Sequence, residues 1–261
     1  MLPIKKRKSI GQHILKNKEI IRDLCNFITE NAPENKYVLF EIGSGQGNLT
    51  IPLLKKLYTL PNKPELIILN EIDYRYLKLL KNNLQEEKLD ELFRIEFLTQ
   101  PFEKCSLNHE NVYLVGNIPF YITGLVFRKL VQSYSLINRV VINLQKDVVD
   151  KISSPNNPLG ITFHIGWEVV KYRIIPPELY DPPPKVFSQI VLMKNKKNRL
   201  ISEKFVKFLY KIFTARKKLL KNILNEKEKA TIRNPSVLDK RPIHLNPQEV
   251  IDIYKDIYQC T

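Results

Sequence analysis

Cysteine is scarce in this 261-residue chain, and its three cysteines stand far apart. Cys25, Cys105 and Cys260 form no Cys-x-x-Cys pair, and the four histidines are scattered. These spacings exclude the usual disulfide frameworks and zinc sites, and no metal is predicted. We therefore expect a protein of a reducing compartment, the cytoplasm.

Long apolar runs are also missing. The sequence has no stretch of about 18 apolar residues, the length that a membrane-spanning helix needs. The basic N-terminal segment MLPIKKRKSIGQH has no apolar region behind it, so it lacks the pattern of a secretory signal. No membrane partner is predicted.

Acidic residues are few relative to basic ones. The chain has 27 Asp and Glu against 42 Lys and Arg, a net charge of +15, while hydrophobic residues make up 43% and predict a substantial core. A domain this basic is expected to bind a polyanion, with nucleic acid the first candidate and an acidic membrane surface the second. A solvated basic surface without such a partner is the alternative.

Strand-like and helix-like segments alternate through the first two-thirds of the chain. Strands are predicted at 37–42, 65–69, 93–98, 112–115, 139–144, 167–175 and 186–193, and helices at 14–28, 49–57, around 77–80 and at 124–131. This alternation is typical of βαβ units and a largely parallel sheet. It predicts an α/β fold with a Rossmann-like sheet over residues 1–198.

The character of the chain changes after about residue 198. Apolar residues then recur at helical spacing: Phe205, Phe208, Leu209, Ile212, Phe213, Leu219, Leu220 and Ile223. A second helical stretch covers 247–257. We predict a small all-helical domain at 199–261.

A glycine-rich turn is the strongest local signal. Gly43, Gly45 and Gly47 lie between the predicted strand at 37–42 and the helix that follows it. Glycine permits positive φ and lets a ligand approach the backbone, and nucleotide-like ligands bind at such turns. The Gly-x-Gly-x-Gly spacing suits a ligand without pyrophosphate, such as S-adenosylmethionine. A tight turn without a ligand is the alternative.

Glu71 follows the next predicted strand, in the stretch Leu69-Asn-Glu-Ile-Asp73. A carboxylate at this strand end can accept hydrogen bonds from both hydroxyls of a ribose. By itself it would be interpreted as a surface acid. Beside the glycine turn, it is predicted to bind ribose.

The stretch Asn117-Ile-Pro-Phe120 follows the predicted strand at 112–115. The Asn117 side chain offers an acceptor and two donors and does not titrate, so it can hold an amino group. Pro119 stiffens the turn, and Phe120 offers a face on which a base can stack. Together they predict a clamp for a planar aminated base, with a capped turn and a packed aromatic as the alternative.

The ordered motifs resemble those of the rRNA adenine dimethyltransferases. The resemblance rests on these segments: Gly11-Gln-His-Ile-Leu15, Glu41-Ile-Gly-Ser-Gly-Gln-Gly47, Glu71-Ile-Asp73, Asn117-Ile-Pro-Phe120, Gln145-Lys146, Pro182-Pro-Pro-Lys-Val186 with Ser188, and Phe213-x-x-Arg-Lys-Lys-x-Leu220. It covers nearly the whole chain. It implies S-adenosylmethionine as methyl donor and adenines near the 3′ end of small-subunit rRNA as target.

The resemblance also assigns roles to single residues. It implies cofactor contacts for His13, Leu15, Gly43, Gly45, Glu71, Gln100 and Asn117, and places Asn117, Pro119 and Phe120 at the target base. Two positions depart from the family. Thr99-Gln-Pro-Phe102 stands where Gly-Asp-Ala-Leu is usual, so that Gln100 would accept from the amino group of the cofactor's adenine through its side-chain carbonyl. His13 stands where an Asn is usual.

Two basic clusters are predicted to bind RNA. The first is an N-terminal arm of Lys5, Lys6, Arg7 and Lys8. The second, Arg216, Lys217, Lys218 and Lys221, is predicted on the first helix of the last domain, although helical spacing also allows Arg216 to be partly buried. The expected partner is small-subunit rRNA or its assembly intermediate, bound by a monomer.

Other functions fit parts of this pattern. A large-subunit rRNA methyltransferase that confers antibiotic resistance is the alternative within the family, although the segments at 213–222 and 238–247 resemble the housekeeping branch, particularly its compact archaeal-type members. A DNA adenine methyltransferase can use a similar clamp, but about 60 residues leave little room for a DNA-recognition domain. A ribosome-assembly or transcription factor of the same fold, without essential catalysis, is the non-enzymatic alternative.

Overall fold

The computed structural model describes residues 13–258, which form two compact units. The first unit runs up to Lys146 and includes Val170–Lys194; we call it the catalytic unit. The second, the helical unit, comprises Asp147–Val169 and the chain from Asn195 onward. The predicted domain boundary at 198/199 differs from this division. The segment Asp147–Val169 was predicted in the first domain, but its helical residues pack against the C-terminal helices.

Seven strands of the described chain form one sheet in the order β4-β3-β2-β5-β6-β9-β7. Their bounds are β2 Val38–Ile42, β3 Leu66–Asn70, β4 Ile95–Leu98, β5 Val112–Gly116, β6 Ile137–Gln145, β7 Trp167–Ile175 and β9 Ser188–Asn195. The first five strands of this order, from β4 to β6, are parallel to one another, whereas β9 is antiparallel to β6. The predicted Rossmann-like α/β class is confirmed.

The order of the sheet reverses at β2, which pairs with β3 on one side and β5 on the other. The carboxyl ends of these three strands therefore meet at one edge of the sheet, and a crevice opens where the chain departs in opposite directions. All predicted cofactor and target motifs except the N-terminal one follow a strand that ends at this edge.

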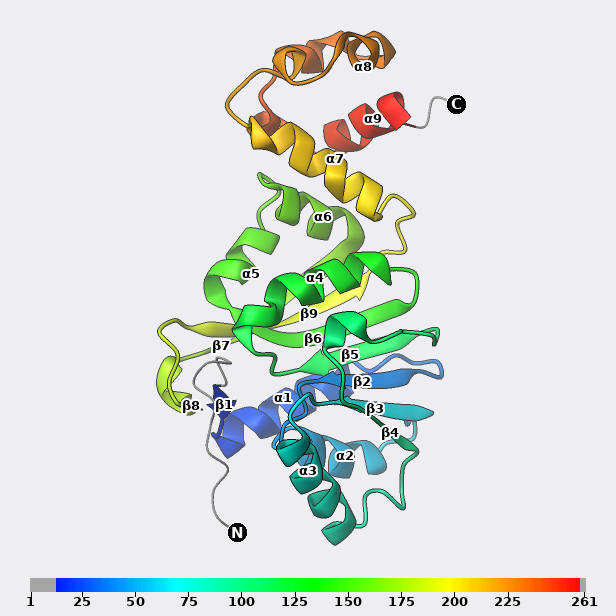
Figure 1. The fold of residues 1–261 in the computed structure, drawn as a ribbon, viewed down its shortest axis with the longest axis vertical. Coiled ribbons are helices and arrows are strands. Elements are labelled where there is room, and N and C mark those ends of the chain that lie inside the picture. The colour runs from blue at the N-terminus through cyan, green and yellow to red at the C-terminus, as the bar shows by residue number, and fades with distance from the viewer. Residues whose placement is uncertain (1–12, 259–261) are drawn as a thin grey trace. The chain divides into compact units, whose positions relative to one another are not determined.

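Helices cover both faces of the catalytic sheet (Figure 1). Their bounds are α1 Lys18–Glu30, α2 Thr50–Tyr58, α3 Tyr74–Glu86 and α4 Thr123–Gln132. The apolar sides of α1, α2 and α3 share one core with alternate residues of the strands, such as Leu39 and Val115. The other face carries α4 and the 3₁₀ turn η2 (Phe102–Lys104), where the Phe102 ring packs edge-on to Phe40.

The predicted helix at 14–28 begins later than its apolar spacing suggested. Ile14–Leu15 is a short strand, β1, which pairs antiparallel with β8 (Tyr180–Asp181). Helix α1 begins after Asn17, whose side chain accepts from the Ile20 N–H. An N-cap of this kind satisfies a free amide of the first turn and fixes the start of the helix.

The helical unit contains α5 Lys146–Ile152, α6 Pro158–Gly166, α7 Glu203–Thr214, α8 Glu226–Thr231 and α9 Pro247–Tyr258. Phe205 and Phe208 of α7 pack against Tyr254 of α9. Short 3₁₀ turns connect α7 to α9: η5 Leu220–Asn222, η6 Pro235–Asp239 and η7 Pro242–His244.

Helix α7 is shorter than predicted, because it ends at Thr214 and Ala215 leaves helical geometry. The next positions of its apolar stripe, 216 and 217, carry Arg and Lys, so the next helical turn would bury no large apolar side chain. Across residues 13–258, no helix combines the length and apolarity that crossing a membrane requires.

Candidate active site

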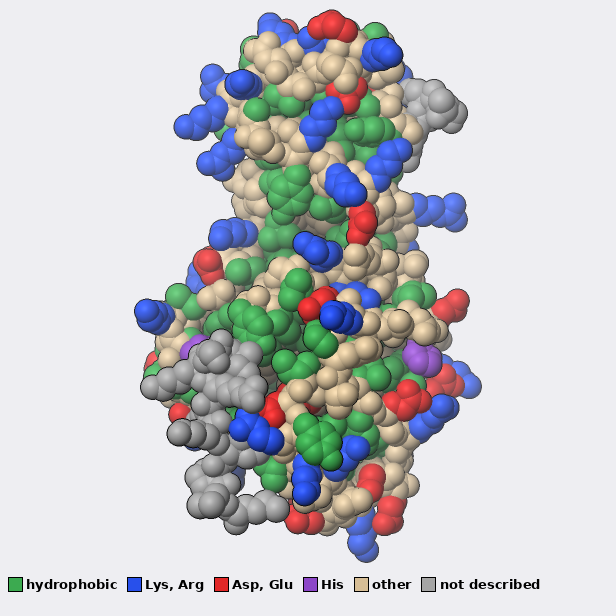
Figure 2. Space-filling view, viewed as in Figure 1, with side chains coloured by type: hydrophobic (Ala, Val, Ile, Leu, Met, Phe, Trp, Pro, Cys, Tyr) green, Lys and Arg blue, Asp and Glu red, His purple; other side chains and the backbone are tan. Residues whose placement is uncertain are grey.

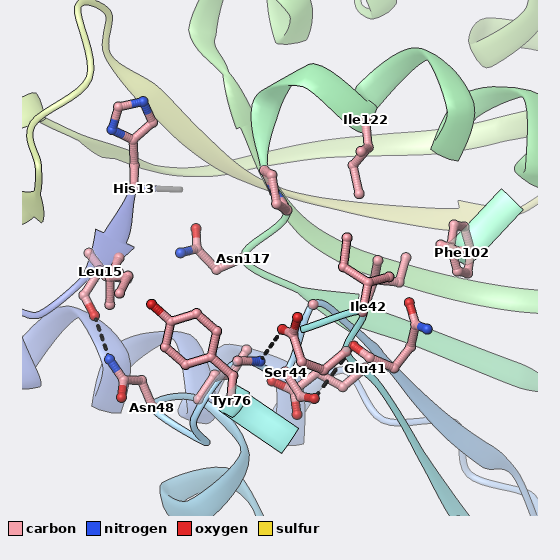
Figure 3. A pocket seen from close by; sticks show the side chains of 18 of the residues that line it. His13, Leu15, Glu41, Ile42, Ser44, Asn48, Tyr76, Phe102, Asn117 and Ile122 are labelled. Atoms are coloured by element: carbon pink, nitrogen blue, oxygen red, sulfur yellow. Dashed lines mark hydrogen bonds between the residues drawn. The ribbon is translucent and has the colours of Figure 1, made fainter. Parts of the chain in front are cut away.

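A cavity of about 310 Å³ opens at the carboxyl edge of β2, β3 and β5 (Figure 3). The lining residues used below are His13, Leu15, Glu41, Gly43, Gly45, Asn48, Asn70, Glu71, Ile72, Tyr76, Pro101, Phe102, Glu103, Asn117, Pro119 and Tyr121. They come from the segment His13–Leu15, from the ends of β2 and β3, from the loops after β2, β3, β4 and β5, and from the start of α3. The cavity thus joins the predicted cofactor motifs and the predicted clamp.

All three glycines of the turn after β2 have positive φ: Gly43 at +70°, Gly45 at +55° and Gly47 at +97°. This backbone region is strained for residues with a side chain. At Gly47 an added Cβ would also lie 2.8 Å from Cδ1 of Leu80, because the turn packs on α3. The turn therefore presents bare backbone to the cavity, as a ligand that approaches closely requires.

Glu71 is held by two backbone amides at the bottom of the cavity. Its Oε2 accepts from Gly45 N–H at 2.9 Å, and its Oε1 accepts from Asp73 N–H at 2.8 Å. Burial raises the pKa of Glu71, and the amides of Asp73 and Gly45 act in the opposite direction. Each oxygen keeps a lone pair, so the ionised group can accept two hydroxyl donors.

Glu41 is a second carboxyl in the cavity wall, and sequence analysis gave it no role. It is 2% exposed, and its Oε2 accepts from Thr50 Oγ1 at 2.7 Å. Burial raises its pKa to about 7, with a smaller contribution from the charge of Glu71. The available signal was an acid within the otherwise apolar strand 37–42, where an unpaired charge is costly.

Asn117 reaches the cavity from the end of β5, and in Figure 3 its carboxamide is directed toward His13 and Leu15. The preceding Gly116 is required by packing: an added Cβ there would lie 2.6 Å from the carbonyl oxygen of Ile42. Asn117 Oδ1 accepts from Asn143 Nδ2 at 2.9 Å. The amide that was predicted to hold the target amino group is therefore itself held from β6.

Pro119 lines the cavity, and a Cβ on Gly43 would lie 3.6 Å from its Cδ, so the clamp and the glycine turn face each other. Phe120 is not part of the cavity wall. Its ring lies beside His13, with 5.9 Å between centroids and a 34° tilt. Tyr121, 54% exposed, lines the cavity instead.

The N-terminal motif is fixed by β8 and by the glycine turn. His13 Nδ1 donates to the carbonyl oxygen of Pro182 at 2.7 Å, and Asn48 Nδ2 donates to the carbonyl oxygen of Leu15 at 3.5 Å. Both His13 and Leu15, the predicted cofactor contacts, line the cavity. This wall comes from residues distant in sequence, joined by β1–β8 pairing.

Gln100 does not line the cavity. Its side chain is exposed, and its backbone carbonyl accepts from Asn70 Nδ2 at 2.8 Å. That bond turns the loop after β4 so that Pro101, Phe102 and Glu103 form the wall. Glu103, three residues after Gln100, thus supplies a carboxyl group to the cavity wall near the position of the missing Asp.

Ile72 and Tyr76 also line the cavity and were missed by sequence analysis. Ile72 follows Glu71 directly and is 48% exposed, an unusual position for an isoleucine. The signal was an apolar residue placed between two acids after a strand. Its exposed face offers a flat apolar contact to a ligand bound by Glu71.

The second basic cluster lies in a turn rather than on a helix, which corrects the prediction. Arg216, Lys217 and Lys218 follow the end of α7, and all three are exposed, so Arg216 is not a buried structural residue. Lys221 Nζ pairs with Asp239 Oδ1 at 2.7 Å. Lys and Arg side chains are spread over the helical unit on the face shown in Figure 2. Lys5, Lys6, Arg7 and Lys8 lie outside the described residues.

The fold and the cavity together define the class of Rossmann-like methyltransferases, for which S-adenosylmethionine is the methyl donor. The chain itself belongs to the ribosomal RNA adenine dimethylase family, whose model matches residues 4–258. It is accordingly an rRNA adenine dimethyltransferase.

Similar proteins agree with this assignment. The chain is 31% identical to the "Ribosomal RNA small subunit methyltransferase A" of Prochlorococcus marinus (strain MIT 9312), over 94% of this chain and 90% of that protein. It is 32% identical to the protein of the same name from Mycoplasmopsis synoviae (strain 53), over 86% and 84%. A dimethyladenosine transferase structure from Plasmodium falciparum superposes with a TM-score of 0.78 at 20% identity, covering 95% and 98%, and shows the shared fold.

Proposed function

We propose that this enzyme dimethylates adenines near the 3′ end of small-subunit rRNA during ribosome biogenesis. The observation that carries the proposal is the shared cavity, in which the glycine turn and Glu71 face Asn117 and Pro119. The names of the curated relatives support the small subunit over the large-subunit resistance reaction. The cytoplasmic location and the monomeric state stay predictions.

The cofactor-binding residues are proposed from the wall after β2, β3 and β4. Glu71 would accept from the ribose hydroxyls, and the backbone of Gly43 and Gly45 would lie against the rest of the ligand. Ile72 would pack against the adenine ring of the cofactor. Glu103 is proposed in place of Gln100 as the acceptor for the amino group of the cofactor's adenine, because Glu103 lines the cavity and Gln100 does not.

The residues of the clamp would position the target base. When bound, S-adenosylmethionine supplies an electrophilic methyl group on its sulfonium. Asn117 Oδ1, with one lone pair left, would accept from the exocyclic amino group and stabilise the positive charge that develops on its nitrogen. The neutral amine would attack without prior deprotonation and would lose one N–H proton after the transfer, so orientation is the main contribution of the chain.

The target adenine must leave its stack to enter the cavity. Phe120 beside His13, and the exposed Tyr121, offer aromatic surface at this end of the site. Stacking on an aromatic side chain is worth about 1–3 kcal/mol per base. We propose that Phe120 and Tyr121 bind the flipped base or its neighbour.

The basic turn after α7 is the proposed phosphate contact of the helical unit. Arg216, Lys217 and Lys218 are exposed, whereas Lys221 is already paired with Asp239, which makes it the weakest member of the predicted cluster. The N-terminal arm stays a prediction.

Labelled methyl transfer to isolated ribosomal subunits, followed by mapping of the modified bases, tests the function. We expect dimethyladenine near the 3′ end of small-subunit rRNA and no label in the large subunit. Label confined to the large subunit would contradict the proposal. Comparing assembly defects of a null strain with those of an Asn117→Ala strain would separate catalysis from a scaffolding role.

A further inference from the structure

Asn143 is a polar residue in an otherwise apolar part of β6. It is fully buried, between Ile142 and Leu144, which are also fully buried. Its Oδ1 has no hydrogen-bond partner among the described residues. A buried, unsatisfied carbonyl destabilises a fold by about 1–3 kcal/mol, so an aliphatic side chain would be more favourable here if packing were the only requirement.

The sheet register places Asn143 beside the clamp. Gly116 of β5 pairs with Ile142 of β6, so the next residue of each strand, Asn117 and Asn143, lie side by side at the carboxyl edge. Asn143 Nδ2 donates to Asn117 Oδ1 at 2.9 Å. Asn143 itself does not line the cavity, so it acts on the site only through Asn117.

Two further buried groups fix Asn143. Its Nδ2 also donates to Tyr180 Oη at 2.6 Å, and Tyr180 Oη lies 2.6 Å from Ser188 Oγ. Tyr180 is 4% exposed and Ser188 is fully buried. Both amide protons of Asn143 are thereby used, one in the bond to Asn117 and one in the bond to Tyr180. The Tyr180 hydroxyl then has its own proton available for Ser188.

From this chain of contacts, and resting on the proposed function, we infer that Asn143 is a positioning residue for methyl transfer. It selects one orientation of the Asn117 carboxamide, the one whose oxygen is fixed at the β6 side of the clamp. If Asn117 were turned by 180°, its NH₂ group would face the NH₂ group of Asn143, and two donors would oppose each other.

This orientation matters more in the second methyl transfer than in the first. An adenine amino group has two N–H bonds and can present either to the single free lone pair of Asn117 Oδ1. After one methylation only one N–H remains, so the acceptor must already be in place. Loss of Asn143 should therefore slow the second transfer most and leave monomethyladenine as a major product.

The test compares Asn143→Leu and Tyr180→Phe with the wild-type enzyme on undermethylated small ribosomal subunits. For Asn143→Leu we expect kcat to fall at least tenfold and monomethyladenine to accumulate, while the calorimetric Kd for S-adenosylmethionine stays within twofold. Tyr180→Phe, which frees one amide proton of Asn143 but leaves the bond to Asn117, should show a smaller loss of the same kind. In an Asn117→Ala background, Asn143→Leu should cause no further loss.

Asn138→Leu is the matched control. Asn138 lies at the opposite end of β6, and its Nδ2 donates to Asn111 Oδ1 at 2.5 Å, a second Asn–Asn pair far from the cavity. Unchanged kcat and product ratio in Asn143→Leu, or a parallel loss of Tm, cofactor affinity and activity, would overturn the inference. Failure of the proposed function would instead appear as absence of adenine methylation by the wild-type enzyme.

Discussion

The two buried carboxyl groups of the cavity, Glu71 and Glu41, have different hydrogen-bond partners. Glu71 accepts from two backbone amides, which favour its ionised form, whereas Glu41 has one hydroxyl partner, Thr50. The charge of Glu71 adds to the burial that raises the pKa of Glu41. The backbone amides thus counter the effect of burial on the pKa of Glu71, whereas burial raises the pKa of Glu41 to about 7.

Replacing Glu71 by Gln should weaken cofactor binding, because a neutral amide accepts from only one hydroxyl and loses the charge-assisted bonds. We expect a rise in Kd for S-adenosylmethionine of roughly tenfold to a hundredfold, or about 1.4–2.8 kcal/mol, measured by calorimetry. Glu65→Gln, at the exposed opposite end of β3, is the control. Equal affinity in wild type and Glu71→Gln would remove Glu71 from the site.

Glu41 makes stability depend on pH. Its folded pKa of about 7 lies above the ordinary glutamate pKa of 4.5, so the folded state binds the proton more tightly than the unfolded state. This contribution is present below pH 4.5 and is lost as pH rises to 7. Relative to Glu41→Gln, the wild-type free energy of unfolding should fall by roughly 2–3 kcal/mol over that interval. Denaturant titrations at several pH values measure it, and parallel pH profiles would contradict it.

At the scale of elements, strand spacing and apolar alternation predicted most of the sheet. Trp167–Ile175 was predicted with the bounds it has, and the remaining strands agree closely. Errors arose where a short element depends on a distant partner. Strand β1 exists because β8 pairs with it, and the helices within Asp147–Val169 pack with the C-terminal ones. Neither partner can be located from local sequence.

Gly116 tests the close packing at the end of β5. Gly116→Ala should lower the free energy of unfolding by about 1–3 kcal/mol, because its Cβ would lie 2.6 Å from the Ile42 carbonyl oxygen and the backbone must shift. Chemical denaturation measures this change, and methyl transfer should fall with it as Asn117 moves. Gly124→Ala, with open space at its Cβ, is the control and should not destabilise the protein. Equal stability of the two variants would show that the strand end adapts.

At the scale of the whole molecule, the net charge of +15 is the property most directly linked to RNA. Phosphate contacts release counterions, so affinity falls as salt rises, in proportion to the number of contacts. Exposed basic residues after α7 are free of the packing constraints that hold α7 itself. The charge therefore acts on association and leaves the core unaffected.

Neutralising Arg216, Lys217 and Lys218 together to Gln should reduce the slope of log affinity against log salt by about 2 to 3. Filter binding of small-subunit rRNA over a salt series measures this slope. Lys36→Gln is the control, because Lys36 precedes β2 at the amino edge of the sheet and pairs with Glu65. A slope equal to that of the wild type would exclude the turn after α7 as a phosphate contact.

The class of fold, the glycine turn and the positions of Glu71 and Asn117 at strand ends could be predicted from the sequence, because each depends on local backbone needs or on side-chain chemistry at a strand end. Which groups contact one another depended on the tertiary structure. It placed Glu103 in the cavity wall and Gln100 outside it, moved the basic cluster off α7, and brought Asn143 to Asn117. These outcomes depend on strand register and loop direction, which are fixed by hydrogen bonds and packing between segments far apart in the chain.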